Sequence, residues 1–183
     1  MLVILDRDGV INEDLPRGVL ALEQFRFIEG SPEAIAALSK AGHVVVIATN
    51  QSSIGKGWMD VQMLDTIHTH MREYIERAGG RIENIYVAPD APHTPSLHRK
   101  PAPGMLLEAM QDFASLPSNT VMIGDALRDL QAAHAAGCRA ILVATGKGEA
   151  THKALPQDFT HTPYVANLAA AAQLLLATAD KAD

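Results

Sequence analysis

Two aspartates, Asp6 and Asp8, are separated by one residue and directly follow a short apolar run at the start of the chain. That run, residues 1–5, is typical of a buried strand, and Gly9 favours a sharp turn behind the second aspartate. Two carboxylates at the exit of one strand repel each other, so a divalent cation, or a phosphate with its metal, best explains them. The competing interpretation is an aspartate-rich turn without a ligand.

Three further stretches bring polar side chains to the ends of predicted elements. The row of small polar residues 49–52 follows a β-branched run, and Asp125 closes another such run, with Asp129 four residues later. Arg99 and Lys100 form a basic pair just before a predicted helix start. Hydroxyls and a lysine that could hold a phosphate therefore accompany acids that could hold a metal.

Apolar runs alternate with helical patterns along the chain, which predicts an α/β fold of three layers, Rossmann-like, with a central parallel sheet and helices on both faces. We expect strands near 2–6, 43–49, 82–88, 119–124 and 139–144, and helices near 31–41, 60–78, 103–115, 126–136 and 166–178. In such sheets, ligands bind beyond the carboxyl ends of the strands. Asp6, Thr49 and Asp125 fall at such ends and Lys100 follows the third strand, so one pocket should collect them.

The composition narrows the class of protein. A chain of 183 residues suits a single domain, 1–183, and its net charge of -6 argues against nucleic acid as the main partner. No apolar stretch approaches the length of a membrane span or a signal segment, so we expect no membrane partner and a cytoplasmic location. The single cysteine, Cys138, excludes an internal disulfide and fits a reducing compartment. We also expect a monomer.

The order Asp-x-Asp, Thr, Lys and Gly-Asp-x-x-x-Asp resembles the four motifs of the haloacid dehalogenase-like (HAD) phosphatases, over about residues 2–145. The resemblance implies Mg²⁺-dependent hydrolysis of a phosphomonoester through an aspartyl-phosphate. It assigns Asp6 as the nucleophile and Asp8 as the general acid and base, with Thr49 and Lys100 on the transferred phosphate. The Mg²⁺ ligands would be Asp6, Asp8 through its backbone carbonyl, and Asp125. The intervals between motifs are too short for the cap domain of this superfamily, so the site should be open.

The role of Asp129 has several possible interpretations, and the glycine-rich segment 146–148 has a plain one. Asp129 could support the metal, hold Lys100, or simply be an acid that favours a helix N-terminus. The segment Gly146-Lys147-Gly148 lacks the upstream glycine of a P-loop, so we interpret it as a surface turn.

Within the superfamily, residues 6–12, 49–57 and 99–105 resemble the heptose 1,7-bisphosphate phosphatases and the related histidinol-phosphate phosphatases. The first family implies removal of the 7-phosphate of a small phosphorylated sugar, D-glycero-D-manno-heptose 1,7-bisphosphate, on the route to lipopolysaccharide precursors. The second is the enzymatic alternative, and a non-catalytic phosphosugar-binding module is the alternative of another class. The resemblance to the heptose enzymes implies these substrate-binding residues: Asp14, Arg17, Asn50, Gln51, Ser52, Lys56 and Arg99.

Two departures from these families matter. Both usually hold a structural zinc through cysteine and histidine in the loop before the basic pair. Here Ala88, Asp90, Ser96 and His98 occupy those positions, so no thiolate remains and no zinc is expected. Ala126 stands where the heptose enzymes usually place a substrate-contacting lysine, which weakens the claim to a contact with a second phosphate.

Overall fold

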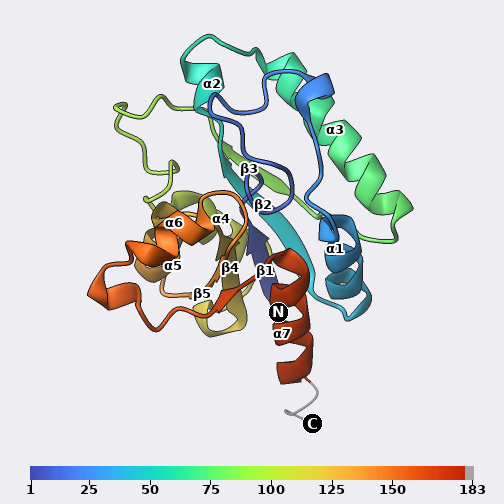
Figure 1. Ribbon diagram of the computed structural model, residues 1–183, viewed down its shortest axis with the longest axis vertical. Coiled ribbons are helices and arrows are strands. Elements are labelled where there is room, and N and C mark those ends of the chain that lie inside the picture. The colour runs from blue at the N-terminus through green and yellow to red at the C-terminus, as the bar shows by residue number, and fades with distance from the viewer. Residues whose placement is uncertain (180–183) are drawn as a thin grey trace.

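Six parallel strands form one sheet, in the order β3-β2-β1-β4-β5-β6. The strands are β1 (Leu2–Leu5), β2 (Val44–Asn50), β3 (Ile85–Ala88), β4 (Thr120–Gly124), β5 (Arg139–Val143) and β6 (Tyr164–Val165), labelled where space allows in Figure 1. The computed structural model describes residues 1–179, so residues 180–183 of the predicted domain lie outside the described residues.

The apolar run before the first aspartate becomes the centre of the sheet. β1 pairs in parallel with β2 on one side and β4 on the other, and Leu5 lies in register with Ile47 and Ile123. Its odd-numbered side chains enter one buried core and its even-numbered side chains enter the other. The register sets the polar residues that follow β1, β2 and β4 at one edge of the sheet.

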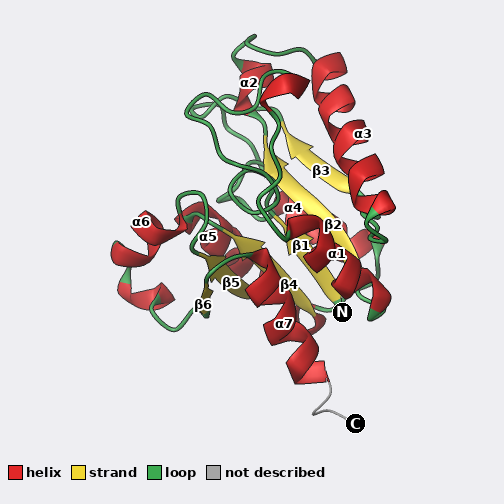
Figure 2. Cartoon of the chain, turned by 45° about the vertical axis from the view of Figure 1, so that its right-hand side comes forward, coloured by secondary structure: helices red, strands yellow, loops and turns green. Residues whose placement is uncertain are grey.

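Helices cover both faces of the sheet and complete three layers (Figure 2), which confirms the predicted fold. One face carries α1 (Ser31–Lys40), α3 (Val61–Arg77) and α7 (Leu168–Ala179), and the other carries α4 (Gly104–Asp112) and α5 (Leu127–Ala136). Two short helices, α2 (Ser52–Gly55) and α6 (Gly148–Lys153), follow β2 and β5.

Local signals explain several helix ends. The Asp60 carboxylate accepts a hydrogen bond of 2.8 Å from the Met63 amide at the start of α3. Gly137 ends α5 in the left-handed region, at φ 75°. The Asn167 side chain accepts a hydrogen bond of 3.0 Å from the Ala170 amide, so the last helix begins at residue 168 rather than 166.

Other boundaries differ from the prediction. The strand predicted over 82–88 begins only at Ile85, and the helix predicted over 103–115 ends at Asp112. The second shortening has a backbone cause, since Ala114 takes a φ of 47°. The sequence patterns do not indicate α2, α6 or β6, because elements of 4, 6 and 2 residues are too short to show a period.

The connections that follow β1 and β2 contain helices and a turn. Within residues 1–179, the segment between β1 and β2 holds a 3-10 turn (Leu22–Gln24) and α1, and the segment between β2 and β3 holds α2 and α3, so neither contains an inserted cap domain. No helix in this part of the chain is long and apolar enough to cross a membrane.

Candidate active site

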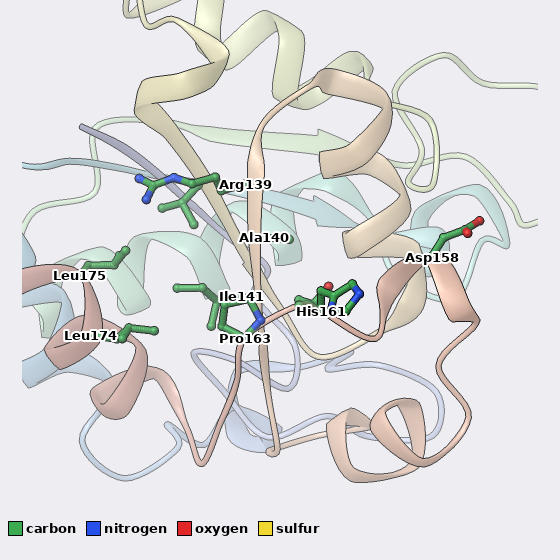
Figure 3. A pocket seen from close by; sticks show the side chains of 10 residues that line it. Arg139, Ala140, Ile141, Asp158, His161, Pro163, Leu174 and Leu175 are labelled. Atoms are coloured by element: carbon green, nitrogen blue, oxygen red, sulfur yellow. The ribbon is translucent and has the colours of Figure 1, made fainter. Parts of the chain in front are cut away.

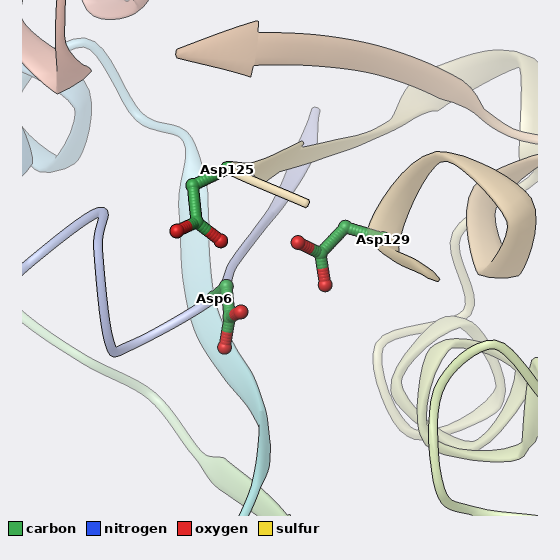
Figure 4. Close-up of side chains that lie close together, drawn as sticks. All are labelled: Asp6, Asp125 and Asp129. Atoms are coloured by element: carbon green, nitrogen blue, oxygen red, sulfur yellow. The ribbon is translucent and has the colours of Figure 1, made fainter. Parts of the chain in front are cut away.

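Three buried aspartates meet at the carboxyl ends of β1 and β4. Asp6 follows β1, Asp125 follows β4, and Asp129 lies in the first turn of α5. Each offers one carboxylate oxygen, and these oxygens lie within 4.8 Å of one another (Figure 4). Buried carboxylates this close repel strongly, so the cluster is suited to a positive ligand.

Asp125 shows this repulsion most clearly. Burial raises the pKa of its carboxyl to about 7, and the charges of Asp6 and Asp129 add to the rise. Its Oδ2 accepts a hydrogen bond of 2.8 Å from the Lys147 amide, whereas its buried Oδ1 has no hydrogen-bond partner. An unpartnered carboxylate oxygen beside other acid oxygens is the donor set that Mg²⁺ prefers.

Lys100 lies buried between two of these acids. Its Nζ is 3.0 Å from Asp6 Oδ1 and 2.7 Å from Asp129 Oδ1. The other oxygen of Asp129 accepts a hydrogen bond of 3.0 Å from the Ala126 amide at the start of α5. Asp129 therefore both holds the lysine and caps the helix, so two of the alternatives left open by the sequence apply together.

The polar row at the carboxyl end of β2 fixes the backbone around the lysine. The Asn50 side chain donates to the Lys100 carbonyl (2.9 Å) and accepts from the Lys100 amide (3.0 Å). Gln51 donates from the same side-chain nitrogen to the buried Thr49 hydroxyl and to Asp8 Oδ2, each at 2.9 Å. The side-chain amides of Asn50 and Gln51 therefore form hydrogen bonds with the predicted catalytic residues.

Asp8 faces a different group of partners from Asp6. Its carboxylate accepts hydrogen bonds from Arg7, Asn12 and Gln51, at 2.9 Å for the shortest contact with each. Burial alone would raise the pKa of Asp8, but the charge of Arg7 and these hydrogen bonds hold that pKa below its ordinary value. Asp6 has the opposite balance: burial raises its pKa, and Lys100 only partly opposes the rise.

A polar cavity of about 200 Å³ opens beside the acids. All seven predicted substrate-binding residues line it: Asp14, Arg17, Asn50, Gln51, Ser52, Lys56 and Arg99. Seven other residues also line it, and three of these, which were not predicted to bind substrate, have an aromatic or charged side chain: Trp58, Arg128 and Lys147.

Of these three, Arg128 is closest to the acids. Its guanidinium lies 3.5 Å from Asp6 Oδ2 and 4.0 Å from Asp125 Oδ1. Its place one helical turn after Asp125 is the sequence signal that could have indicated it. Ala126 stands where the heptose enzymes usually have a lysine, and Arg128 supplies a positive charge on that side of the cavity.

Trp58 organises two of the predicted cations at the rim. The Arg17 guanidinium lies 4.6 Å and the Lys56 Nζ 4.4 Å from the centre of the indole ring. Both distances suit cation–π attraction. Lys147 pairs with Asp14 across the rim.

The interpretation of Gly146-Lys147-Gly148 as a surface turn was incomplete. Although the Lys147 side chain is 53% exposed, its backbone amide binds Asp125. A Cβ at Gly146, which has φ +60°, would lie 2.3 Å from Asp125 Oδ2. The Thr145 hydroxyl donates to the Gly9 carbonyl at 2.7 Å. The segment therefore forms a wall of the acidic cluster.

The loop that lacks cysteines is held by hydrogen bonds. The Ser96 hydroxyl donates to Asp90 Oδ2 at 2.6 Å and accepts from the Arg99 amide at 3.1 Å. The Arg99 guanidinium donates to the Asp90 carbonyl at 3.1 Å. His98 pairs instead with Glu108, at 3.3 Å. The expected lack of zinc stays a prediction.

A second cavity, of about 490 Å³, lies between β5 and α7 (Figure 3). Its lining is largely apolar and includes Val121 and Arg139, which stand near the amino ends of β4 and β5. It is therefore at the opposite end of the sheet from Asp125, and it holds no pair of acids. The smaller polar cavity is the candidate active site.

Comparison with known proteins agrees with this geometry. Residues 97–171 match the family described as HAD-hydrolase-like. The D-glycero-beta-D-manno-heptose-1,7-bisphosphate 7-phosphatase of Neisseria meningitidis serogroup A is 43% identical over 150 residues, which cover 82% of this chain and 80% of that protein. The enzyme of that name from Pseudomonas aeruginosa is 42% identical over 176 residues, covering 96% of this chain and 97% of the relative.

A solved structure is also similar. The D,D-heptose 1,7-bisphosphate phosphatase from B. bronchiseptica, complexed with magnesium and phosphate, superposes with a TM-score of 0.92 at 38% identity, covering 97% of this chain and 98% of that one.

Proposed function

Since the chain belongs to the heptose-1,7-bisphosphate 7-phosphatase family of HAD-like hydrolases, we propose that it removes the 7-phosphate of D-glycero-β-D-manno-heptose 1,7-bisphosphate in a Mg²⁺-dependent reaction. The observation that carries the proposal is the cluster of Asp6, Asp125 and Lys100 beside a cavity rich in cations.

In this reaction Asp6 attacks phosphorus, and the bond from phosphorus to the sugar oxygen breaks. The bonding electrons go to that oxygen, which takes a proton from Asp8. Because Asp8 is held ionised in the protein alone, it takes up this proton from water when the phosphate dianion binds beside it and raises its pKa. Water then attacks the aspartyl-phosphate, Asp8 accepts a proton from the water, and inorganic phosphate leaves. Lys100, 3.0 Å from Asp6, places positive charge where the phosphoryl oxygens would lie.

The metal site follows from the same residues. Asp6, Asp125 and the backbone carbonyl of Asp8 would hold Mg²⁺, as predicted, and the unpartnered Asp125 Oδ1 supports this assignment. The ion supplies positive charge that offsets repulsion between the attacking carboxylate and the phosphate dianion. Asp129 is within reach, but its two oxygens already serve Lys100 and the Ala126 amide, so we assign it to the lysine.

The charge of the cavity favours a bisphosphate over the runner-up substrate. Its lining includes one acid, Asp14, and five cations: Arg17, Lys56, Arg99, Arg128 and Lys147. These cations suit a second phosphate, and they would repel the ammonium group of histidinol phosphate. A module that only binds phosphosugars would not need an acid such as Asp8 beside the nucleophile.

The wider setting is proposed on the same basis. We take the chain to be one domain, 1–183, acting as a cytoplasmic monomer in the synthesis of lipopolysaccharide precursors, without nucleic acid or membrane partners. The acids and cations named above suffice for the proposed chemistry, so the site needs no residue from a second subunit. Light scattering during size exclusion tests the monomer: a dimer mass would contradict it.

Steady-state kinetics with a substrate panel test the function. The panel contains both anomers of the heptose bisphosphate, heptose 7-phosphate, histidinol phosphate and p-nitrophenyl phosphate, each with and without Mg²⁺. We expect kcat/KM to be highest for the β-bisphosphate, by at least about tenfold over the 7-phosphate, because only the former presents a second phosphate to the cations. Preference for histidinol phosphate would overturn the proposal.

A further inference from the structure

Arg7 stands between the two catalytic aspartates and is completely buried. Its guanidinium donates to both Asp8 oxygens, at 2.9 and 3.0 Å from Nη2, and to the Gln51 side-chain oxygen at 3.3 Å. Its Nη1 lies 3.1 Å from Nε2 of His68, a residue of α3 that is 8% exposed. A buried cation is costly unless its donors are used, and these contacts use them on Asp8, on Gln51 and on one histidine.

The contact with His68 determines the state of the imidazole. A guanidinium has only donors, so Nε2 of His68 must be the acceptor. The ring is therefore neutral, with its proton on Nδ1. Burial and the positive charge of Arg7 lower the pKa of His68 to about 3, in agreement with the geometry.

The same network sets the direction of the Asp8 carboxylate. Oδ1 accepts from Arg7 and Asn12, and Oδ2 accepts from Arg7 and Gln51. The polar contacts of the Arg7 guanidinium are all to protein groups, namely Asp8, Gln51 and His68, and His68 lies behind Arg7 as seen from Asp8. Their route to the reaction runs through Asp8.

We propose that Arg7 and His68 are positioning residues: His68, on α3, holds the Arg7 guanidinium, and the guanidinium holds the Asp8 carboxylate toward the leaving oxygen. This inference rests on the proposed role of Asp8 as general acid and base. If the pair only stabilised the fold, removing it would lower activity by the same factor for good and poor leaving groups. Proton transfer depends on geometry, so a displaced Asp8 should hurt poor leaving groups selectively.

The test replaces His68 by Leu, which removes the acceptor, and by Gln, whose side-chain oxygen can accept in its place. His70→Leu, two residues along the same helix, is the matched control. Each variant is assayed on p-nitrophenyl phosphate, a good leaving group, and on the best phosphosugar of the panel. If the unmodified enzyme hydrolyses the aryl phosphate but not the heptose bisphosphate, the proposed substrate is wrong, and the roles of Arg7 and His68 can still be tested on the best phosphosugar.

For His68→Leu we expect kcat on the phosphosugar to fall about tenfold or more. We expect kcat on the aryl phosphate to change by less than about twofold, and KM for both substrates to stay unchanged. His68→Gln should recover most of the loss, and His70→Leu should match the unmodified enzyme. Equal losses on both substrates, or no loss, would overturn the proposal.

A second measurement does not depend on the Leu variant folding. Imidazole ¹⁵N shifts of the unmodified enzyme, assigned with His68→Gln, should show a neutral ring protonated at Nδ1. An imidazolium, or a ring protonated at Nε2, would rule out the acceptor role.

Discussion

Asp129→Asn tests the assignment of this residue to Lys100. Removing one partner of a buried ion pair costs about 3–5 kcal/mol. Lys100 keeps Asp6 at 3.0 Å, and the change also relieves the repulsion of Asp129 with Asp6 and Asp125, so we expect a loss near the lower end, about 3 kcal/mol. The Asn side chain can still accept from the Ala126 amide, so Asp129→Ala should lose about 1 kcal/mol more. Since only Asp6 would then hold Lys100, the ammonium group would be less precisely placed and kcat should fall about a hundredfold.

The assay is urea unfolding without Mg²⁺, with the loss taken from the midpoint at constant slope. Asp65→Asn, at an exposed position of α3, removes the same charge from a solvated site and is the control. If Asp129→Asn unfolds within about 1 kcal/mol of the unmodified protein, the buried ion pair is not what holds the lysine. Equal stability of the Asn and Ala variants would show that the hydrogen bond from the Ala126 amide to residue 129 does not stabilise the start of α5.

Other changes address the nucleophile, the metal, the buried histidine and zinc. Asp6→Asn should lower kcat by at least about a thousandfold while leaving the fold intact, because it removes the attacking charge and keeps the shape; near-normal turnover would exclude the covalent route. Gly146→Ala, which sets a Cβ 2.3 Å from Asp125 Oδ2 at φ +60°, should weaken Mg²⁺ binding about tenfold by calorimetry, and unchanged affinity would contradict the close approach. The unfolded chain protonates His68 near pH 6.5 and the folded chain only near 3, so stability should fall with decreasing pH in that window, by about 1.4 kcal/mol per unit from this residue. His68→Gln should flatten that slope in urea unfolding, and an unaltered slope would show that the ring is not buried neutral. A zinc-selective chelator should leave melting temperature and activity unchanged, whereas removal of Mg²⁺ should stop turnover; one bound zinc per chain would reverse our interpretation of the 88–98 loop.

The sequence by itself determined the sheet and the chemistry at its edge. Asp6 and Asp125 each follow an apolar run long enough to mark a buried strand, and parallel strands set their carboxyl ends at one edge. The resemblance of the motifs to those of the HAD phosphatases and the heptose enzymes then indicated Lys100 and the seven cavity residues. Strand-end positions are local properties, and local properties are visible without a structure.

The tertiary structure alone decided which partner each polar group takes. Whether Asp129 capped a helix or held Lys100 depended on where α5 meets the loop after β3, and both contacts form. The same holds for His68, 61 residues from Arg7, which meets the guanidinium only because α3 packs into the same core as β1 and β2. Hydrogen bonds and ion pairs need atoms within about 3 Å, and no periodicity along a chain sets distances between segments that only packing brings together.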